Sequence, residues 1–315
     1  MTVGLVLMGY AGVVGVGGGV LLARSGWTSK APLLAIVTYL AAAWSVVIAV
    51  ALAGLTLALH TSALSGGLSR VIGACVIRLR EEYGTPGGAT VAALGIIIAG
   101  AVIARTTLAA VLHARAAGRQ ALLHAETARL VGRQRPELGA VLLEHAQPAA
   151  YCVAGRQPTV IVTSGAVEAL SAAQLDAVMA HERAHLRYHH HRLQALARVA
   201  RQVLPFMPLL RDAESQVEKF IEMHADDAAT SVHDPRRLAK ALVVLATSSS
   251  PAPALAAGAT DVIARVQRLQ RPVEPLGRAR RQVLRLAAAA LAITPVLLAF
   301  TPAAVALALG RVPTA

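Results

Sequence analysis

The chain has 315 residues, of which 56% are hydrophobic and only 15% charged, and its mean hydropathy is +0.57. This composition is typical of a membrane protein rather than of an ordinary soluble domain. The net charge of +13 comes almost wholly from arginines beside apolar stretches, which favours membrane flanks over direct binding of nucleic acid. The two cysteines, Cys75 and Cys152, exclude a disulfide framework and a CxxC site, so histidines and carboxylates must hold any metal.

Four apolar runs are long enough to cross a bilayer as helices, because a hydrocarbon core of ~30 Å needs roughly 20 apolar residues. We expect these spans at about residues 3–23, 33–59, 87–104 and 286–309. The last span contains Pro295 and Pro302, which transmembrane helices tolerate. Gly15 and Gly19 have GxxxG spacing, which indicates a close-packing face on the first span.

The spans divide the chain into three parts. We expect a membrane region of three helices at 1–113, a metal-binding block with its own core at 114–281, and a fourth helix with a short tail at 282–315. The block is expected to be α+β. The fold class is therefore a mainly α membrane protein with an α+β block between its third and fourth membrane helices.

Positive residues at the span ends predict the orientation. Arg24 and Lys30 border the first loop, and a cluster of arginines precedes the fourth span: Arg278, Arg280, Arg281 and Arg285. Placing both clusters in the cytoplasm puts the N-terminus and the loop from about His60 to Pro86 outside, and the block inside. Three arginines of that outer loop argue mildly against this: Arg70, Arg78 and Arg80. We expect a multi-pass protein of a bacterial plasma membrane.

Local patterns predict the elements of the block. A helical pattern at 115–146 is broken at Pro136, and two β-prone runs at 151–153 and 159–163 flank a Gly/Pro turn, as in a hairpin. Ser171 and Gln174 form a capping-box pattern that announces a helix. That helix runs into the histidine-rich stretch and is followed by an amphipathic segment, a further helix and an Ala/Ser/Pro linker, expected at 193–210, 214–230 and 248–258.

The helix after the capping box carries the pattern HExxH. Residues four apart lie on one face of a helix, so His181 and His185 can direct imidazole nitrogens at one metal ion. Glu182 is then placed to accept a proton from a metal-bound water. Zinc suits these ligands, and one ion per chain is expected. The alternative is a solvated helix that merely displays histidines, but the helix cap and the apolar Met179 and Ala180 before the motif favour a buried site.

A second acidic helix offers the third ligand. Glu222 and Asp226 lie four residues apart on one helix face. We assign Glu222 to the metal and Asp226 to a histidine's other ring nitrogen, where a carboxylate orients a metal-binding imidazole. Glu218 and Asp227 are weaker rivals, because Glu218 lacks such a partner and Asp227 faces another side.

These motifs carry a family resemblance. The stretch Leu175–His191, with Tyr151–Gly155 and Val162–Gly165 before it and the Glu222–Asp226 pair after it, resembles the BlaR/MecR-type membrane metallopeptidases. More broadly it resembles gluzincins, whose third zinc ligand is a glutamate. Sensor receptors of this type carry a penicillin-binding domain after the fourth span, and we expect none in this chain.

The resemblance implies a gluzincin-like zinc endopeptidase in the cytoplasm. Its zinc ligands would be His181, His185 and Glu222, with Glu182 as general base and a cytoplasmic protein, such as a transcriptional repressor, as substrate. A donor that stabilises the transition state is usual in such enzymes. The candidates are His233, Tyr188 and Arg187, each of which also has a purely structural explanation.

Two other functions remain open. The chain resembles, less closely, quality-control or prenyl-protein-type membrane gluzincins, whose helices interrupt the catalytic part. It could also be a non-catalytic membrane signal transducer that retains the motif, although an intact Glu182 counts against this. We interpret His189, His190 and His191 as an extension of the motif helix and favour a solvated basic end over an accessory metal site. The sequence specifies no activating signal and no oligomeric state.

Overall fold

The computed structural model describes residues 2–58, 88–155, 157–248, 255–271 and 274–308. In chain order, the elements are α1 (Thr2–Ala23), α2 (Pro32–Ala58), α4 (Gly88–Val131), β1 (Arg133–Arg135), β2 (Ala140–Leu143), β3 (Ala150–Val153), β4 (Thr159–Thr163), α5 (Ser164–Ala169), α6 (Ala172–Arg187), α7 (His190–Val203), α8 (Pro208–Thr230), α9 (Pro235–Ser248), α10 (Leu255–Gln270) and α11 (Arg278–Ala308). The expected outer loop from His60 to Pro86, with Cys75, lies outside the described residues.

Helices dominate, and four of them are long and apolar enough to cross a membrane: Thr2–Ala23, Pro32–Ala58, Thr90–His124 and Arg278–Thr301. They suggest a multi-pass membrane protein, as the sequence predicted. The helix α2 is central and packs against α1, α4 and α11. A Cβ added at Gly54 would lie 2.7 Å from the carbonyl oxygen of Gly95, so this glycine pair lets the backbones of α2 and α4 touch.

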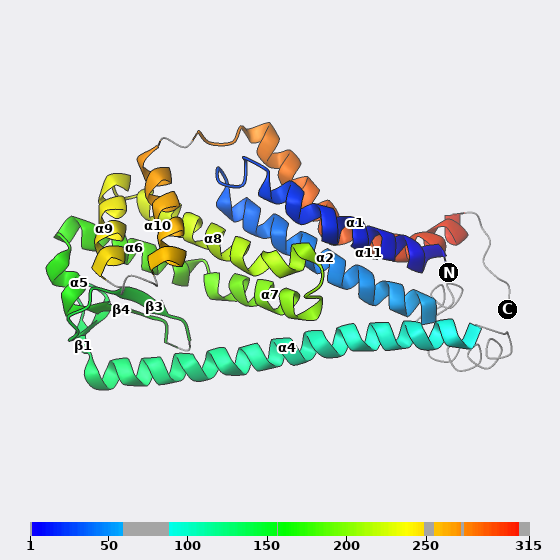
Figure 1. Cartoon of the computed structure of the whole chain (residues 1–315), viewed down its shortest axis with the longest axis horizontal. Coiled ribbons are helices and arrows are strands. Elements are labelled where there is room, and N and C mark those ends of the chain that lie inside the picture. The colour runs from blue at the N-terminus through cyan, green and yellow to red at the C-terminus, as the bar shows by residue number, and fades with distance from the viewer. Residues whose placement is uncertain (1, 59–87, 156, 249–254, 272–273, 309–315) are drawn as a thin grey trace.

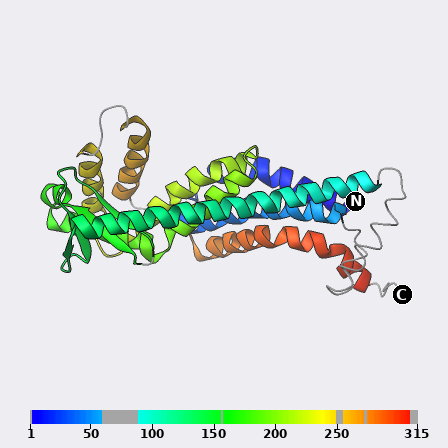
Figure 2. The same ribbon diagram turned by 90° about the horizontal axis from the view of Figure 1, so that it is seen from below.

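The helix α4 is longer than predicted and joins the membrane helices to the sheet (Figures 1 and 2). It continues without a break from the third apolar run to Val131. The helical prediction for residues 115–146 is wrong beyond this point, because β1 and β2 follow. The short apolar run from Ala140 to Leu143 is helix-compatible by pattern, but it pairs in parallel with β4 and is buried there.

The sheet has the strand order β1-β2-β4-β3. The predicted hairpin is confirmed, since β3 and β4 are antiparallel with Tyr151 opposite Ile161. The strand β4 has partners on both sides, which leaves β3 as the outer strand at that end of the sheet. The capping box is also confirmed: the Ser171 backbone N–H donates to Gln174, and the Gln174 backbone N–H donates to the Ser171 hydroxyl.

The histidine-rich stretch does not extend the motif helix, contrary to our interpretation. The helix α6 ends at Arg187, and His189 has a φ of 52°, the left-handed conformation that breaks a helix. The next helix, α7, begins at His190. The chain direction changes at this point, and His190 becomes buried beside the motif rather than solvated at a helix end.

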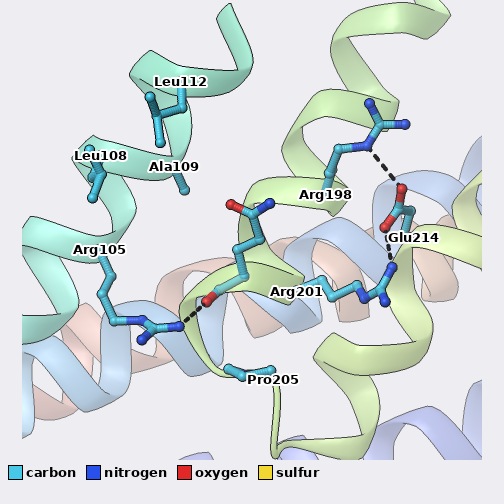
Figure 3. A pocket seen from close by; sticks show the side chains of 9 residues that line it. Arg105, Leu108, Ala109, Leu112, Arg198, Arg201, Pro205 and Glu214 are labelled. Atoms are coloured by element: carbon cyan, nitrogen blue, oxygen red, sulfur yellow. Dashed lines mark hydrogen bonds and ion pairs between the residues drawn. The ribbon is translucent and has the colours of Figure 1, made fainter. Parts of the chain in front are cut away.

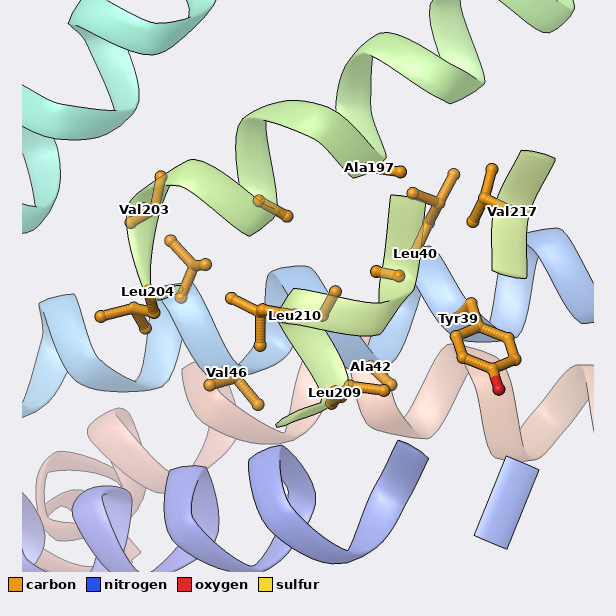
Figure 4. Close-up of a cluster of buried hydrophobic side chains, with 14 of the residues drawn as sticks. Tyr39, Leu40, Ala42, Val46, Ala197, Val203, Leu204, Leu209, Leu210 and Val217 are labelled. Carbon is orange, nitrogen blue, oxygen red and sulfur yellow. The ribbon is translucent and has the colours of Figure 1, made fainter. Parts of the chain in front are cut away.

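The hairpin formed by α7 and α8 shares one hydrophobic core with the membrane helices (Figure 4). At its tip, a Cβ added at Gly18 or Gly19 of α1 would lie 3.6 or 3.3 Å from Leu209, and one at Gly15 would lie 2.6 Å from Sδ of Met207. The predicted small-residue face of α1 therefore does support close packing, but its partner is this hairpin. The block between the third and fourth spans is thus joined to the membrane region by a common core.

The expected linker at 248–258 is wrong in its last part. Residues 249–254 lie outside the described chain, but α10 already begins at Leu255. This helix packs along α9 and contacts α8, and so brings Arg265 to Asp226 beside the histidine motif. The last part of the Ala/Ser/Pro run therefore belongs to α10, the helix that carries Arg265.

Candidate metal centre

Three side chains from two helices converge at one point. His181 and His185 of α6 and Glu222 of α8 offer ligand atoms that lie within 4.8 Å of one another. The two Nε2 atoms of the histidines are 3.1 Å apart, and each lies 3.5 Å from an oxygen of Glu222. The capped start of α6 and its buried face against α8 fix this arrangement.

These distances suit a zinc ion. Ligands at about 2.0–2.2 Å from a tetrahedral centre lie about 3.3–3.6 Å from one another. Two of the three separations, at 3.5 Å, fall in that range, and the third, at 3.1 Å, is slightly shorter. Two imidazole nitrogens that face each other at 3.1 Å also need a shared proton or a shared cation between them. The donor set is therefore that of a three-ligand zinc site, although no ion is shown.

Asp226 and Arg265 form a charged layer behind these ligands. Nδ1 of His181 lies 3.0 Å from Oδ1 of Asp226, at an angle away from the ideal hydrogen-bond direction. The guanidinium of Arg265 donates to both oxygens of Asp226, at 2.9 and 2.6 Å, and a further nitrogen lies 2.8 Å from Oε2 of Glu222. Arg265 thus holds two of the carboxylates in place by charge-assisted contacts.

Arg265 was not recognised in the sequence. It lies in a helix hidden by an apparent linker, 39 positions after Asp226. Its spacing from the motif gives no periodic signal, so only the packing of α10 against α9 and α8 reveals it.

On the other side of the site, the imidazole rings of His185, His190 and His224 form a hydrogen-bonded chain. Nδ1 of His190 lies 3.1 Å from Nδ1 of His185, and its Nε2 lies 2.9 Å from Nδ1 of His224. His190 is 2% exposed, and the ring of Tyr188 stacks beside it. Neither His190 nor His224 had been assigned a role from the sequence. The only signal for His190 was its place in the histidine run.

Glu182 points to the outer strand of the sheet. It is in hydrogen-bonding contact with Cys152 of β3, and burial raises the pKa of Glu182 to about 7. Burial and the Glu182 carboxylate together raise the pKa of the Cys152 thiol to about 12. The predicted general base therefore lies between the histidine ligands and the strand β3.

The electrostatics of the three ligands favour a cation. Burial lowers the pKa of His185 to about 4, which leaves its imidazole neutral at pH 7 and able to bind a metal. Burial opposes a charge on His181 as well, but contacts with Asp226 and Glu222 raise its pKa to about 9. Burial favours the neutral acid at Glu222, but His181 and Arg265 lower its pKa to about 2. Carboxylates that stabilise a proton on His181 would equally stabilise a divalent cation.

The contacts that the structure gives the three proposed transition-state donors are with residues other than His181, His185 and Glu222. Arg187 is exposed, and its guanidinium lies over the ring of Tyr188 at 5.6 Å. Tyr188 contacts the rings of His190 and His224. His233 follows the end of α8, where its backbone N–H donates to Ala229. In the described part of the chain, the cationic group that reaches the ligands is Arg265.

A cavity of about 1040 Å³ lies along the strand β3. The strand β3 forms one wall with Tyr151, Cys152 and Val153, and α4 forms another along its length from Ala110 to His124. Trp44 of α2 lines the far end. The cavity therefore leads from a membrane helix to the strand beside Glu182. The strand β4 is already paired on both sides, so β3 is the strand available at this end of the sheet.

Comparison with known proteins agrees with this geometry. The model of Peptidase family M48 matches residues 114–248, which include every residue of the converging triad and Asp226. Searches of the curated proteins and of the solved structures found no match.

A metallopeptidase is the class that the matched region and its donor set define. The match supports the M48 family in particular, whose members are zinc metallopeptidases. Arg265 lies outside the matched residues and is supplied by α10.

Proposed function

We propose that the protein is a membrane-embedded zinc endopeptidase that cleaves a protein chain at the membrane surface on the cytoplasmic side. The single observation that carries this proposal is the convergence of His181, His185 and Glu222, with Glu182 held between them and the strand β3. When bound, the metal would act as a Lewis acid on the peptide carbonyl.

Side chains of the protein would bind the substrate, transfer the proton and orient the metal ligands. An extended substrate segment lies in the cavity along α4 and pairs with β3, as peptides add to an exposed strand. Glu182 accepts a proton from the attacking water and passes it to the leaving amine. Its raised pKa of about 7 suits a group that must both take and return a proton near neutral pH. Asp226 and Arg265 keep His181 and Glu222 oriented.

The cytoplasmic placement rests on the charged flanks of the membrane helices. The loop after α1 lies on the same side as the site, because Arg268 of α10 donates to the carbonyl of Ser29 and Lys30 lies 3.8 Å from Glu274. Arg24, Lys30 and the arginines at the start of α11 then flank the membrane on that one side. Positive flanks favour the cytoplasm.

The experiment compares wild type with Glu182→Gln in detergent. Zinc content is measured by mass spectrometry, and cleavage of a casein-like substrate and of the protein itself is followed on gels. We expect about one zinc per chain in both proteins and a loss of cleavage of at least ~10²-fold in the variant. Glu168→Gln, an exposed change on the neighbouring helix α5, is the matched control. Wild type without zinc would overturn the metalloenzyme, and equal cleavage by both proteins would overturn Glu182 as base. No cleavage by either protein would favour a non-catalytic transducer.

Two kinds of substrate fit a membrane peptidase. A BlaR/MecR-type regulatory enzyme cleaves a soluble repressor, whereas a quality-control enzyme takes membrane proteins. The shared core of the α7–α8 hairpin and the membrane helices supports the second kind, since it holds the site close to the bilayer. Parallel assays of one reporter, soluble or fused to a membrane helix, would distinguish them. Preference for the soluble form supports the regulatory role, and preference for the anchored form supports quality control.

A further inference from the structure

A second cavity, of about 680 Å³, lies between α4 and the α7–α8 hairpin (Figure 3). It is separate from the metal centre and shares no lining residue with the substrate cavity. Its charged lining consists of three arginines and one glutamate: Arg105, Arg198, Arg201 and Glu214.

The charges of this cavity do not balance. Arg198 and Arg201 each contact one oxygen of Glu214, at 2.9 and 2.7 Å. Two guanidinium groups thus share one carboxylate. Arg105 donates to the backbone carbonyl of Gln202 at 2.6 Å, and the described structure gives it no carboxylate partner. Three cations around a single anion give the cavity a net positive charge and more N–H donors than one carboxylate can accept.

The cavity lies where a membrane span ends. Arg105 is the first charged residue of α4 after the uncharged run from Gly88 to Ala104, which is roughly 25 Å long as a helix. That length is close to the hydrocarbon thickness of a bilayer, so Arg105 lies near the head-group level. Leu108 and Leu112 form an apolar wall beside it and are 60% and 54% exposed. Cationic and apolar walls together suit an amphiphile with an anionic head.

We propose that this cavity binds the phosphate head group of an acidic phospholipid. Guanidinium groups hold phosphate oxygens through paired N–H donors, and basic pockets between membrane helices bind lipid head groups in this way. The bound lipid would bridge α4 and the hairpin that carries Glu222 on α8. The proposal requires insertion in a membrane but not peptidase activity, so it stands or fails apart from the proposed reaction.

The test measures lipid retention by native mass spectrometry of the full chain in a neutral detergent. Phosphatidylglycerol and phosphatidylcholine are added separately, and inorganic phosphate is added as a competitor. We expect phosphatidylglycerol to bind at least about fivefold more tightly than phosphatidylcholine, and millimolar phosphate to leave it in place. Equal binding of the two lipids would overturn the proposal. Displacement of the lipid by phosphate alone would show a free-anion site and would also overturn it.

Matched variants assign the binding to this cavity. Arg105→Gln and Arg198→Gln are each expected to weaken phosphatidylglycerol binding about fivefold, whereas Arg105→Lys keeps a cation and most of the binding. Glu214→Gln removes the carboxylate that competes for the arginines, so binding should hold or tighten. Arg280→Gln is an exposed change at the start of α11 and should leave phosphatidylglycerol binding unchanged. Weakened binding in Glu214→Gln or Arg280→Gln would contradict the assignment. Melting without added lipid checks that each variant folds.

Discussion

His190 connects the candidate metal ligand His185 to His224 through its two ring nitrogens, at 3.1 and 2.9 Å. His185 directs Nε2 at the converging ligands, so its Nδ1 must carry the proton. Nδ1 of His190 then accepts, and Nε2 of His190 donates to Nδ1 of His224. Burial lowers the pKa of His190 to about 3 and also lowers that of His224, which keeps both rings neutral, as this arrangement requires.

The first prediction concerns this imidazole chain. His190→Leu removes the acceptor for His185 and is expected to weaken zinc affinity by about 10–100-fold, the usual effect of losing a group that orients a metal ligand. His190→Asn keeps an acceptor near the same place and should restore part of the affinity. Competition with a zinc chelator measures both. His189→Asn is the control, because Asn tolerates the left-handed backbone at this exposed position. Equal affinity in His190→Leu and wild type would exclude the orienting role.

The second prediction concerns Arg265. Arg265→Gln leaves Asp226, which is fully buried, without its strongest partner and Glu222 without its nearest cation. Removal of one partner from a buried pair costs about 3–5 kcal/mol, so the metal-free variant should melt at a lower temperature. Zinc would then replace the missing charge, and the rise in melting temperature on adding zinc should exceed that of wild type.

Melting curves with and without zinc test the Arg265 prediction. Arg271→Gln, an exposed change just after the same helix, is the control and should follow wild type in both conditions. A zinc-dependent rise in Arg265→Gln no larger than in wild type would contradict the charge argument.

Local sequence patterns predicted the parts of the site that are close in the chain. The capping box at Ser171 and the four-residue spacing of the motif place His181 and His185 on one helix face. The same four-residue spacing predicted that Glu222 and Asp226 share one helix face. The contributions of Arg265 and His190 depend on tertiary geometry. Arg265 is brought to Asp226 by the packing of α10, and His190 is placed beside His185 by the left-handed residue His189, which ends α6 and lets α7 begin. A periodic pattern carries no information about either.

The fold, like the site, was predicted where local sequence patterns specify it and missed where distant segments pack together. Apolar length alone located the four helices that are long and apolar enough to cross a membrane. The strand β2 was missed because its apolar run is short and its partner β4 is distant in sequence. The packing of the α7–α8 hairpin against α1 and α2 was also missed, because the amphipathic pattern at 193–210, which includes Arg198 and Arg201, does not specify what its apolar side packs against. Those charges lie on the side of the hairpin that faces the second cavity (Figure 3).

The third prediction concerns the glycine contact between α2 and α4. A Cβ at Gly54 would lie 2.7 Å from the Gly95 carbonyl oxygen and 2.8 Å from the Ala99 nitrogen, both backbone atoms that cannot turn away. Gly54→Ala should therefore destabilise the protein by about 1–3 kcal/mol through overpacking. Gly12→Ala has open space around the added methyl group and serves as control. Thermal melting in detergent compares them, and equal melting temperatures would exclude the close contact.

The last prediction concerns Cys152, which lies in the wall of the substrate cavity beside Glu182. Burial and the Glu182 carboxylate raise the pKa of this thiol to about 12, so at pH 8 only about one molecule in 10⁴ carries a thiolate, against roughly one in ten for a thiol of pKa 9. Because the thiolate is the reactive form, iodoacetamide should modify Cys152 far more slowly in the folded protein than in urea. A Cys75→Ser background isolates this thiol, and mass spectrometry counts the adducts over time. The rate should climb as pH rises from 8 to 10, and labelling at the denatured rate at pH 8 would show that Cys152 is not held against Glu182.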